Sequence, residues 1–202
     1  LEGGDANGIR ETERAVQAAE KITTLPGAEL ADRRNLGAAL AEYGGILAVV
    51  KADEAGADVQ LKRATGYLEA LVRDNPADVL SRARLAYAYE RGAMAAEVSG
   101  KPERLPQALE LFGKSIATTE SVRRDEPANL SHPSTLVKRY NNASRAALKA
   151  GDTKQAADLA GRGLELVRSL AAADKQNIGN QTMLVSVLAT SADIAHKAGG
   201  YE

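Results

Sequence analysis

The sequence has no cysteine, no tryptophan, one phenylalanine and only two histidines among its 202 residues. The absence of cysteine excludes thiolate zinc sites, iron–sulfur clusters, thiol catalysis and a disulfide scaffold. Lysine and arginine number 26 against 27 aspartates and glutamates, so the net charge gives no reason to expect nucleic acid as a partner. The longest nearly apolar runs, such as residues 46–50, fall far short of the ~20 residues that span a bilayer, and we expect no direct membrane insertion.

Alanine is what the chain has in abundance. The sequence contains 39 alanines, about one residue in five. Alanine has the best helix propensity and a low strand propensity, so this composition favours closely packed helices over sheets. A chain of this length can bury a core without disulfides or metals.

A repeat of 48 to 51 residues runs through the chain. Segments 74–78, 126–129 and 173–177 share a polar junction, and a helical stripe of apolar residues at i, i+4, i+7 and i+11 follows each. An earlier segment has the same stripe. The four sets, which predict four A helices, are Leu36, Leu40, Tyr43 and Leu47; Leu85, Tyr89, Gly92 and Ala96; Leu136, Tyr140, Ala143 and Ala147; and Leu184, Leu188, Ser191 and Ala195.

A second helical pattern, the B helix, follows each of the first three A helices. Residues 107–116 align without gaps on residues 155–164, at an offset of 48. The first B helix is expected at about 59–72. A weaker helix is expected at 10–24. The inward residues predicted for these last two helices are Leu61, Ala64, Leu68 and Leu71, and Ile9, Val16, Ala19 and Ile22.

The residues expected at the ends of these helices agree with the pattern. Pro127 cannot continue a helix, because it lacks an amide hydrogen. Gly151 and Gly199 stand where a helix C-terminus favours positive φ, and Asp152 or Thr153 can cap the helix that follows. The first eight residues, with three glycines, are expected to be disordered or foreign to the native chain.

The segment 150–166 resembles the centre of a tetratricopeptide repeat. Its Gly151-Asp152 loop, the alanine five residues after that glycine and the later Leu164-Glu165-Leu166 fall in the family's register. Ala108, Phe112 and Pro127 also resemble part of the family's signature. The period is longer than the family's 34 residues and the consensus tryptophan is absent, so the resemblance is to a long-repeat variant.

Residues 83–92, 169–174 and 24–28 are similar to long tetratricopeptide-like repeats found C-terminal to the catalytic domain of some bacterial serine/threonine protein kinases. The resemblance implies an interaction or sensor segment of a larger signalling protein. No kinase activity is implied, because the chain has no His-Arg-Asp loop, no Asp-Phe-Gly and no glycine-rich loop followed by a strand lysine.

We therefore predict an all-α fold of seven or eight helices, packed as antiparallel hairpins into a right-handed, tetratricopeptide-like solenoid. One domain is expected over residues 9–202, with repeats at about 28–76, 77–127 and 128–176 and a partial repeat at 177–202. Tyr201 and Glu202 align with Thr153 and Lys154, immediately before the shared start of the B helix. The last helix is thus either part of a truncated array or a terminal cap.

Residues with catalytic or metal-binding chemistry are few, and each has a structural interpretation. Asp193 and His196 share a helix face, but two ligands do not make a metal site. We interpret His132 as a capping or loop-packing residue, Gly161 and Gly163 as close helix contacts, and residues 53–58 as the turn between the first A and B helices. We expect no enzyme activity, no metal site and no cofactor.

The polar side of the third A helix is the candidate partner-binding face. Lys138, Asn141, Asn142 and Arg145 fall at i, i+3, i+4 and i+7, opposite the apolar stripe, and one repeat earlier the alignment places Tyr87, Glu90 and Arg91. The resemblance implies that A helices line a concave groove that holds a peptide. Arginine, lysine and asparagine donors suit an anionic or extended peptide.

The predicted function is a non-catalytic scaffold that binds a protein or peptide, as the regulatory or sensor segment of a bacterial signalling protein. The alternative is a small-ligand sensor with its pocket in the superhelix. The localisation stays open between the cytoplasm and, if the chain is fused to a membrane-bound kinase, the extracytoplasmic side. The partner's identity and the oligomeric state also stay open.

Overall fold

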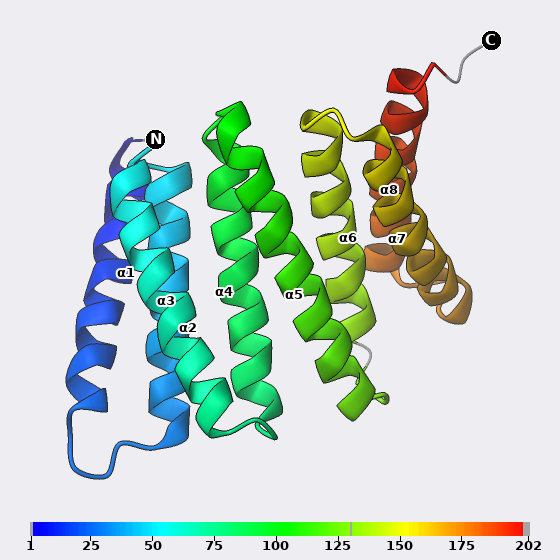
Figure 1. The fold of residues 1–202 in the computed structure, drawn as a ribbon. Coiled ribbons are helices and arrows are strands. Elements are labelled where there is room, and N and C mark those ends of the chain that lie inside the picture. Colours follow the sequence, from blue (N-terminus) through cyan, green and yellow to red (C-terminus); the bar gives the residue numbers. More distant parts are fainter. Residues whose placement is uncertain (1, 130, 200–202) are drawn as a thin grey trace. The chain divides into compact units, whose positions relative to one another are not determined.

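The protein is all-α, as predicted. The computed structural model describes residues 2–129 and 131–199, with side chains from residue 7 onward, and within these ranges it contains no strand. Tyr201 and Glu202, on which the alignment of the last repeat rests, lie outside the described residues. The eight α-helices (Figure 1) are α1 (Glu2–Thr23), α2 (Leu30–Val49), α3 (Glu54–Asp74), α4 (Val79–Val98), α5 (Leu105–Asp125), α6 (Ser131–Lys149), α7 (Thr153–Ala173) and α8 (Ile178–Lys197), with one 3₁₀ turn, η1 (Pro102–Arg104), before α5.

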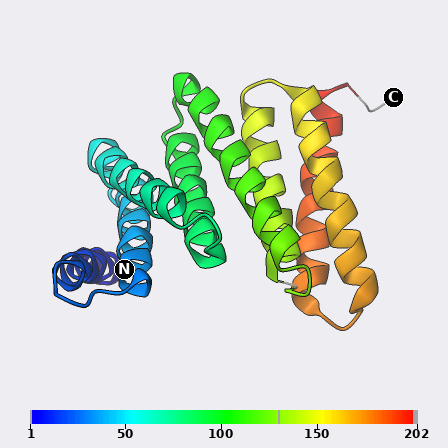
Figure 2. The same cartoon turned by 60° about the horizontal axis from the view of Figure 1, so that its bottom comes forward.

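The helices form two compact units of four. The first unit is Leu1–Arg104, with α1 to α4, and the second is Leu105–Glu202, with α5 to α8. In each unit consecutive helices pack as antiparallel hairpins, and the second helix also packs against the fourth (Figure 2). The sequence predicts one continuous array. The contacts of the structure divide the chain after Arg104, at the connection between α4 and α5.

Glycines on α2 let α3 lie close against it in the first unit. A Cβ atom on Gly37 would stand 2.5 Å from Cγ of Leu68, and one on Gly44 would stand 2.7 Å from Cγ of Leu61. Both leucines are buried. Position 37 thus pairs with 68 and position 44 with 61, which is the order of an antiparallel hairpin.

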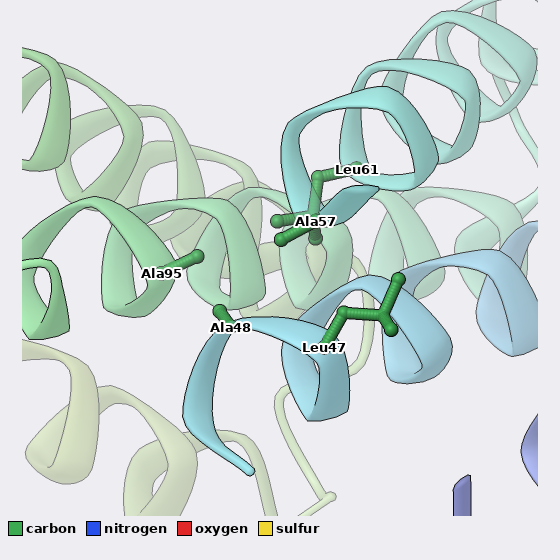
Figure 3. Packing of buried hydrophobic residues seen from close by; sticks show 5 residues of the cluster. All are labelled: Leu47, Ala48, Ala57, Leu61 and Ala95. Atoms are coloured by element: carbon green, nitrogen blue, oxygen red, sulfur yellow. The ribbon is translucent and has the colours of Figure 1, made fainter. Parts of the chain in front are cut away.

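A cluster of small and medium side chains lies at the turn end of this hairpin. Leu47 and Ala48 at the end of α2 meet Ala57 and Leu61 at the start of α3, and Ala95 of α4 completes the group (Figure 3). All five are buried. Three helices can approach closely here because three of the five side chains are alanine.

The second unit repeats this arrangement with different residues. Val137 of α6, Val167 of α7 and Val187 of α8 form one buried cluster. Gly163 of α7 packs against α6, since a Cβ atom there would stand 3.2 Å from Cβ of Tyr140. The close-contact interpretation is confirmed for Gly163. It is wrong for Gly161, which is exposed and would have nothing within 4 Å of an added Cβ atom.

The capping residues predicted at Gly151, Asp152 and Gly199 are confirmed. Asp152 caps α7 by accepting from the backbone N–H of Gln155 at 2.8 Å. Gly151 and Gly199 have φ values of +83° and +80°. The junction residues of the repeat have the same role, because Asp78 caps α4 and Asn177 caps α8.

Two helices start earlier than the sequence pattern indicates. The first begins at Glu2 rather than at residue 10, so the helix includes residues 2–8, which the sequence predicts to be either disordered or foreign to the native chain. Buried Ile9 and Val16 hold α1, whereas Ile22, predicted to face inward, is 44% exposed. The third helix begins at Glu54 rather than 59, because Asp53 caps it through the N–H of Gly56.

The apolar stripe of α8 is not buried as the repeat pattern predicts. Leu188 and Ala195 are exposed and Leu184 is only partly buried. The buried side of α8 instead consists of Asn180, Val187, Thr190 and Ile194. The reason is that α8 packs against α6 and α7, which lie on that side, while Leu188 and Ala195 point away from both.

Candidate binding faces

The seven predicted partner-binding residues fall into two sets, one in each unit. Tyr87, Glu90 and Arg91 lie on α4, and the other four lie on α6. The two sets differ in what their side chains do.

On α4 the predicted residues are engaged with α2. The hydroxyl of Tyr87 donates to Oε2 of Glu42, and Arg91 lies 3.4 Å from Oε1 of the same carboxylate. The guanidinium of Arg91 also lies over the ring of Tyr87, 5.9 Å from its centroid. Burial, followed by the bond to Glu42, raises the pKa of Tyr87 to about 12.

Arg91 reaches this position because α2 has a glycine opposite it. A Cβ atom on Gly45 would stand 2.4 Å from Nε of Arg91, so the guanidinium rests directly on the α2 backbone. The side chain of Arg91 is only 19% exposed. Tyr87 and Arg91 therefore brace α4 against α2, and with Glu90 half-buried this set offers little to a partner.

On α6 the first and last of the four predicted residues are exposed, and the two between them are wholly or partly buried. Lys138 and Arg145 are exposed, Asn142 is partly buried, and Asn141 is 9% exposed. The pattern therefore places two cations about two turns apart, with amides between them.

The amide of Asn141 is half-satisfied. Its Nδ2 donates to Oγ of Ser186 on α8 at 3.2 Å, while its buried Oδ1 has no hydrogen-bond partner among the described residues. Ser186 is not among the residues that the sequence predicts for this face. The spacing of this contact, 45 residues, is also that between Glu42 and Tyr87.

The α8 side of this face is polar too. Thr190, one turn beyond Ser186, is buried and donates its hydroxyl to the Ser186 carbonyl at 3.2 Å. Asp193 is exposed one turn further on. We call the surface made by Lys138, Asn141, Asn142 and Arg145 with Ser186 the α6–α8 polar face.

No protein-family model, no curated protein and no solved structure matches this chain.

Neither histidine belongs to a metal-binding cluster. No group of three or more potential ligands exists among the described side chains, and Asp193 and His196 lie exposed on the last helix. Nε2 of His132 lies 2.8 Å from Oε2 of Glu126, across the loop between α5 and α6. This is the loop-packing role predicted for His132.

The acidic segment 53–58 anchors a loop. Lys101 lies 2.7 Å from Oε2 of Glu54, and Arg104 lies 2.6 Å from Oδ1 of Asp58. The hydrogen bond from Lys101, with support from the nearby Arg104, lowers the pKa of Glu54. These bonds hold the segment between α4 and α5 against the start of α3.

A shallow cleft lies between the N-terminal halves of α2 and α4 in the first unit. It has a volume of about 400 Å³ and is lined by Ala31, Arg34, Asn35, Leu80, Ala83 and Arg84. Arg34 is paired with Asp78 at 2.9 Å, while Arg84 is exposed.

In the described part of the chain no helix is long and apolar enough to cross a membrane.

Proposed function

We propose that this chain is a non-catalytic scaffold of tetratricopeptide-like repeats that binds an extended peptide on the α6–α8 polar face. The observation that carries the proposal is the amide of Asn141. Its Oδ1 is buried without a hydrogen-bond partner among the described residues, between two exposed cations on the same helix.

A buried acceptor without a donor costs about 1–3 kcal/mol. The Oδ1 atom is buried, so a peptide must displace neighbouring side chains to reach it. A backbone N–H that does so would remove that cost, because the side-chain amide of asparagine has the same hydrogen-bonding groups as a peptide bond. Ser186 holds the other end of the amide, so Asn141 is already oriented before a peptide arrives. Orientation before binding lowers the entropy that association must overcome.

Lys138 and Arg145 give the face its preference for charge. Both are exposed, and each can reach a carboxylate on a peptide that lies along α6. The expected ligand is therefore an extended peptide with acidic side chains or a terminal carboxylate. The long repeat and its resemblance support placing this module in a bacterial signalling protein, with the kinase chemistry elsewhere.

An array of random octapeptides rich in aspartate and glutamate tests the proposal. Peptides bound by the wild-type chain should bind at least about tenfold more weakly to Asn141→Ala, Asn142→Ala and Arg145→Ala. The matched control is Lys154→Ala, an exposed cation on α7, which should bind as the wild type does. Unchanged binding by the three variants, with unchanged thermal unfolding, would contradict the proposal.

The cleft of the first unit favours a second candidate, a sensor for a small anion. Its two arginines and the exposed Leu80 suit a ligand with one carboxylate or phosphate and an apolar part. Calorimetric titration of small organic acids into the wild type and Arg84→Ala distinguishes the candidates. Binding of acids lost in Arg84→Ala, without binding of peptides, would favour the sensor.

A further inference from the structure

The helix α8 exposes an apolar face to solvent. Val185 is 66% exposed and Leu188 is 43% exposed, and Ala192 and Ala195 are exposed further along the helix. These four residues form the outer α8 face. They lie on the side of the helix away from Val187 and Ile194, which pack inward.

The same four positions one repeat earlier are completely covered. At an offset of 48 the outer α8 face corresponds to Val137, Tyr140, Ser144 and Ala147 of α6, which are 0–2% exposed. Much of this cover comes from α7, although Val187 and Ile194 of α8 belong to the same buried clusters. Gly163 lies against Tyr140, and Ala156 and Ala160 pack on Ala147.

The first unit shows the same relationship. At an offset of 100 from α6, the positions on α2 are Gly37, Leu40, Gly44 and Leu47. They are covered by α3 through Leu68, Leu61 and Ala57. In both units, therefore, the helix that follows the second helix covers this face of it.

The residues of the outer α8 face match those of α6 in size. The order on α6 is branched, large, small and small, and on α8 it is Val185, Leu188, Ala192 and Ala195. The surface that α7 presents to α6 is a stripe of small residues, Ala156, Ala160, Gly163 and Val167. A helix with such a stripe can approach closely enough to bury the branched and large side chains opposite it.

We propose that the outer α8 face binds an amphipathic helix that presents a stripe of alanine and glycine, in the way that α7 lies on α6. The occupant needs no arginine at the position of Arg162, because that residue pairs with Glu120 and lies over the ring of Tyr140, and α8 has Leu188 in place of the tyrosine. The interaction is apolar, so it differs in chemistry from the α6–α8 polar face.

The probe is a fluorescein-labelled peptide of residues 152–174, which includes α7 and its Asp152 cap. We expect saturable binding to the wild-type chain, measured by fluorescence anisotropy. Val185→Glu and Leu188→Glu should each weaken binding at least about tenfold, because each buries a charge in an apolar contact. A peptide with Ala160→Glu and Gly163→Glu should not bind.

The matched control is Val59→Glu, which makes the same substitution at an exposed valine of α3, 56% exposed, and should bind the peptide as the wild type does. Because Val185 and Leu188 are exposed, the variants should keep the wild-type helical circular dichroism. Absence of binding by the wild type, or equal binding by Val185→Glu, would overturn the proposal. A wild-type dimer in sedimentation that Val185→Glu dissociates would also overturn it, since a second copy would then be the occupant. Asn141→Ala should bind this peptide normally, which separates this test from that of the proposed function.

Discussion

The hydroxyl of Tyr89 donates a hydrogen bond to Oε1 of Glu69, 2.7 Å away and twenty residues earlier in the chain. Tyr140 makes the same bond to Glu120, also twenty residues earlier, in the second unit. In both cases the tyrosine is buried on one helix and the glutamate lies on the helix before it. A repeated contact of this kind fixes the pairing of consecutive helices as well as stabilising it.

Removing these hydroxyls should destabilise the chain measurably. Tyr89→Phe and Tyr140→Phe should each lower the free energy of unfolding by about 1 kcal/mol, since each breaks a hydrogen bond to a carboxylate that solvent partly screens. Urea denaturation followed by circular dichroism measures the loss. Tyr67→Phe is the control, because Tyr67 makes no hydroxyl hydrogen bond in the described structure. Equal effects at all three positions would mean that the bonds contribute nothing specific.

The stability of the first unit should fall in alkali because of Tyr87. The pKa of Tyr87 is raised to about 12, whereas an unfolded tyrosine titrates near 10. Below about pH 10 the phenol is neutral in both states and its contribution is fully present. As the pH rises further, the unfolded chain releases the proton first, so the free energy of unfolding falls until the folded phenol also ionises.

The measurement is urea denaturation from about pH 9 to about pH 12, with Tyr87→Phe as the comparison. The wild type should lose stability more steeply than the variant over this range. Tyrosinate absorbance should show one ionisation fewer at the alkaline end in Tyr87→Phe. Identical slopes for the two proteins would show that Tyr87 titrates normally.

Two glycines should respond to alanine in opposite directions. Gly66 lies within α3 with nothing near its missing side chain, so Gly66→Ala should stabilise by about 0.5–1 kcal/mol through helix propensity. Gly37→Ala should destabilise by about 1 kcal/mol or more, because its Cβ atom would overlap the buried Leu68. Thermal or urea unfolding of both variants tests the pair, and stabilisation by Gly37→Ala would contradict the close approach of α2 and α3.

Asp78 should stabilise the folded chain more than an ordinary helix-capping residue does. It accepts from the N–H of Ser81 at 2.9 Å and also pairs with Arg34 of α2, whereas Asp152 caps α7 through Gln155. We expect Asp152→Ala to cost about 1 kcal/mol and Asp78→Ala about 2 kcal/mol in urea denaturation. Equal costs would show that Arg34 adds nothing.

The contribution of Asp78 to stability should also depend on pH. Partial burial acts to raise its pKa, but the bonds from Ser81 and Arg34 outweigh burial and lower it. The contribution is therefore fully present above about pH 4, where an unfolded aspartate ionises, and is lost as the pH falls through the lower pKa of the folded state. The difference between the wild type and Asp78→Ala should shrink in acid, and a constant difference would contradict this.

The sequence predicts most of the fold because the residues that specify it are local. The stripe on α6 from Leu136 to Ala147 and the cap at Asp152 are visible in spacing alone, and both are confirmed. The exposure of Leu188 is not predictable in this way. An apolar stripe indicates which side of a helix prefers cover, but burial also requires a neighbour on that side.

The candidate site is predicted less well, for a geometric reason. The repeat alignment pairs positions 48 to 51 residues apart, whereas Asn141 meets Ser186, and Glu42 meets Tyr87, across 45. The difference is about one helical turn. The alignment alone therefore misses Ser186, and it does not show that Glu42 bonds both Tyr87 and Arg91.

The close contact between Gly37 and Leu68 has a consequence for how this sequence can vary. In the second unit the corresponding positions are Val137 and Val167, which are buried in one cluster. In the first unit the space between the two helices is filled by the single large side chain of Leu68, and in the second unit it is filled by two valines of medium size. A change in size at either position lowers stability unless the other compensates, so in related chains the two should covary as a single volume rather than drift independently.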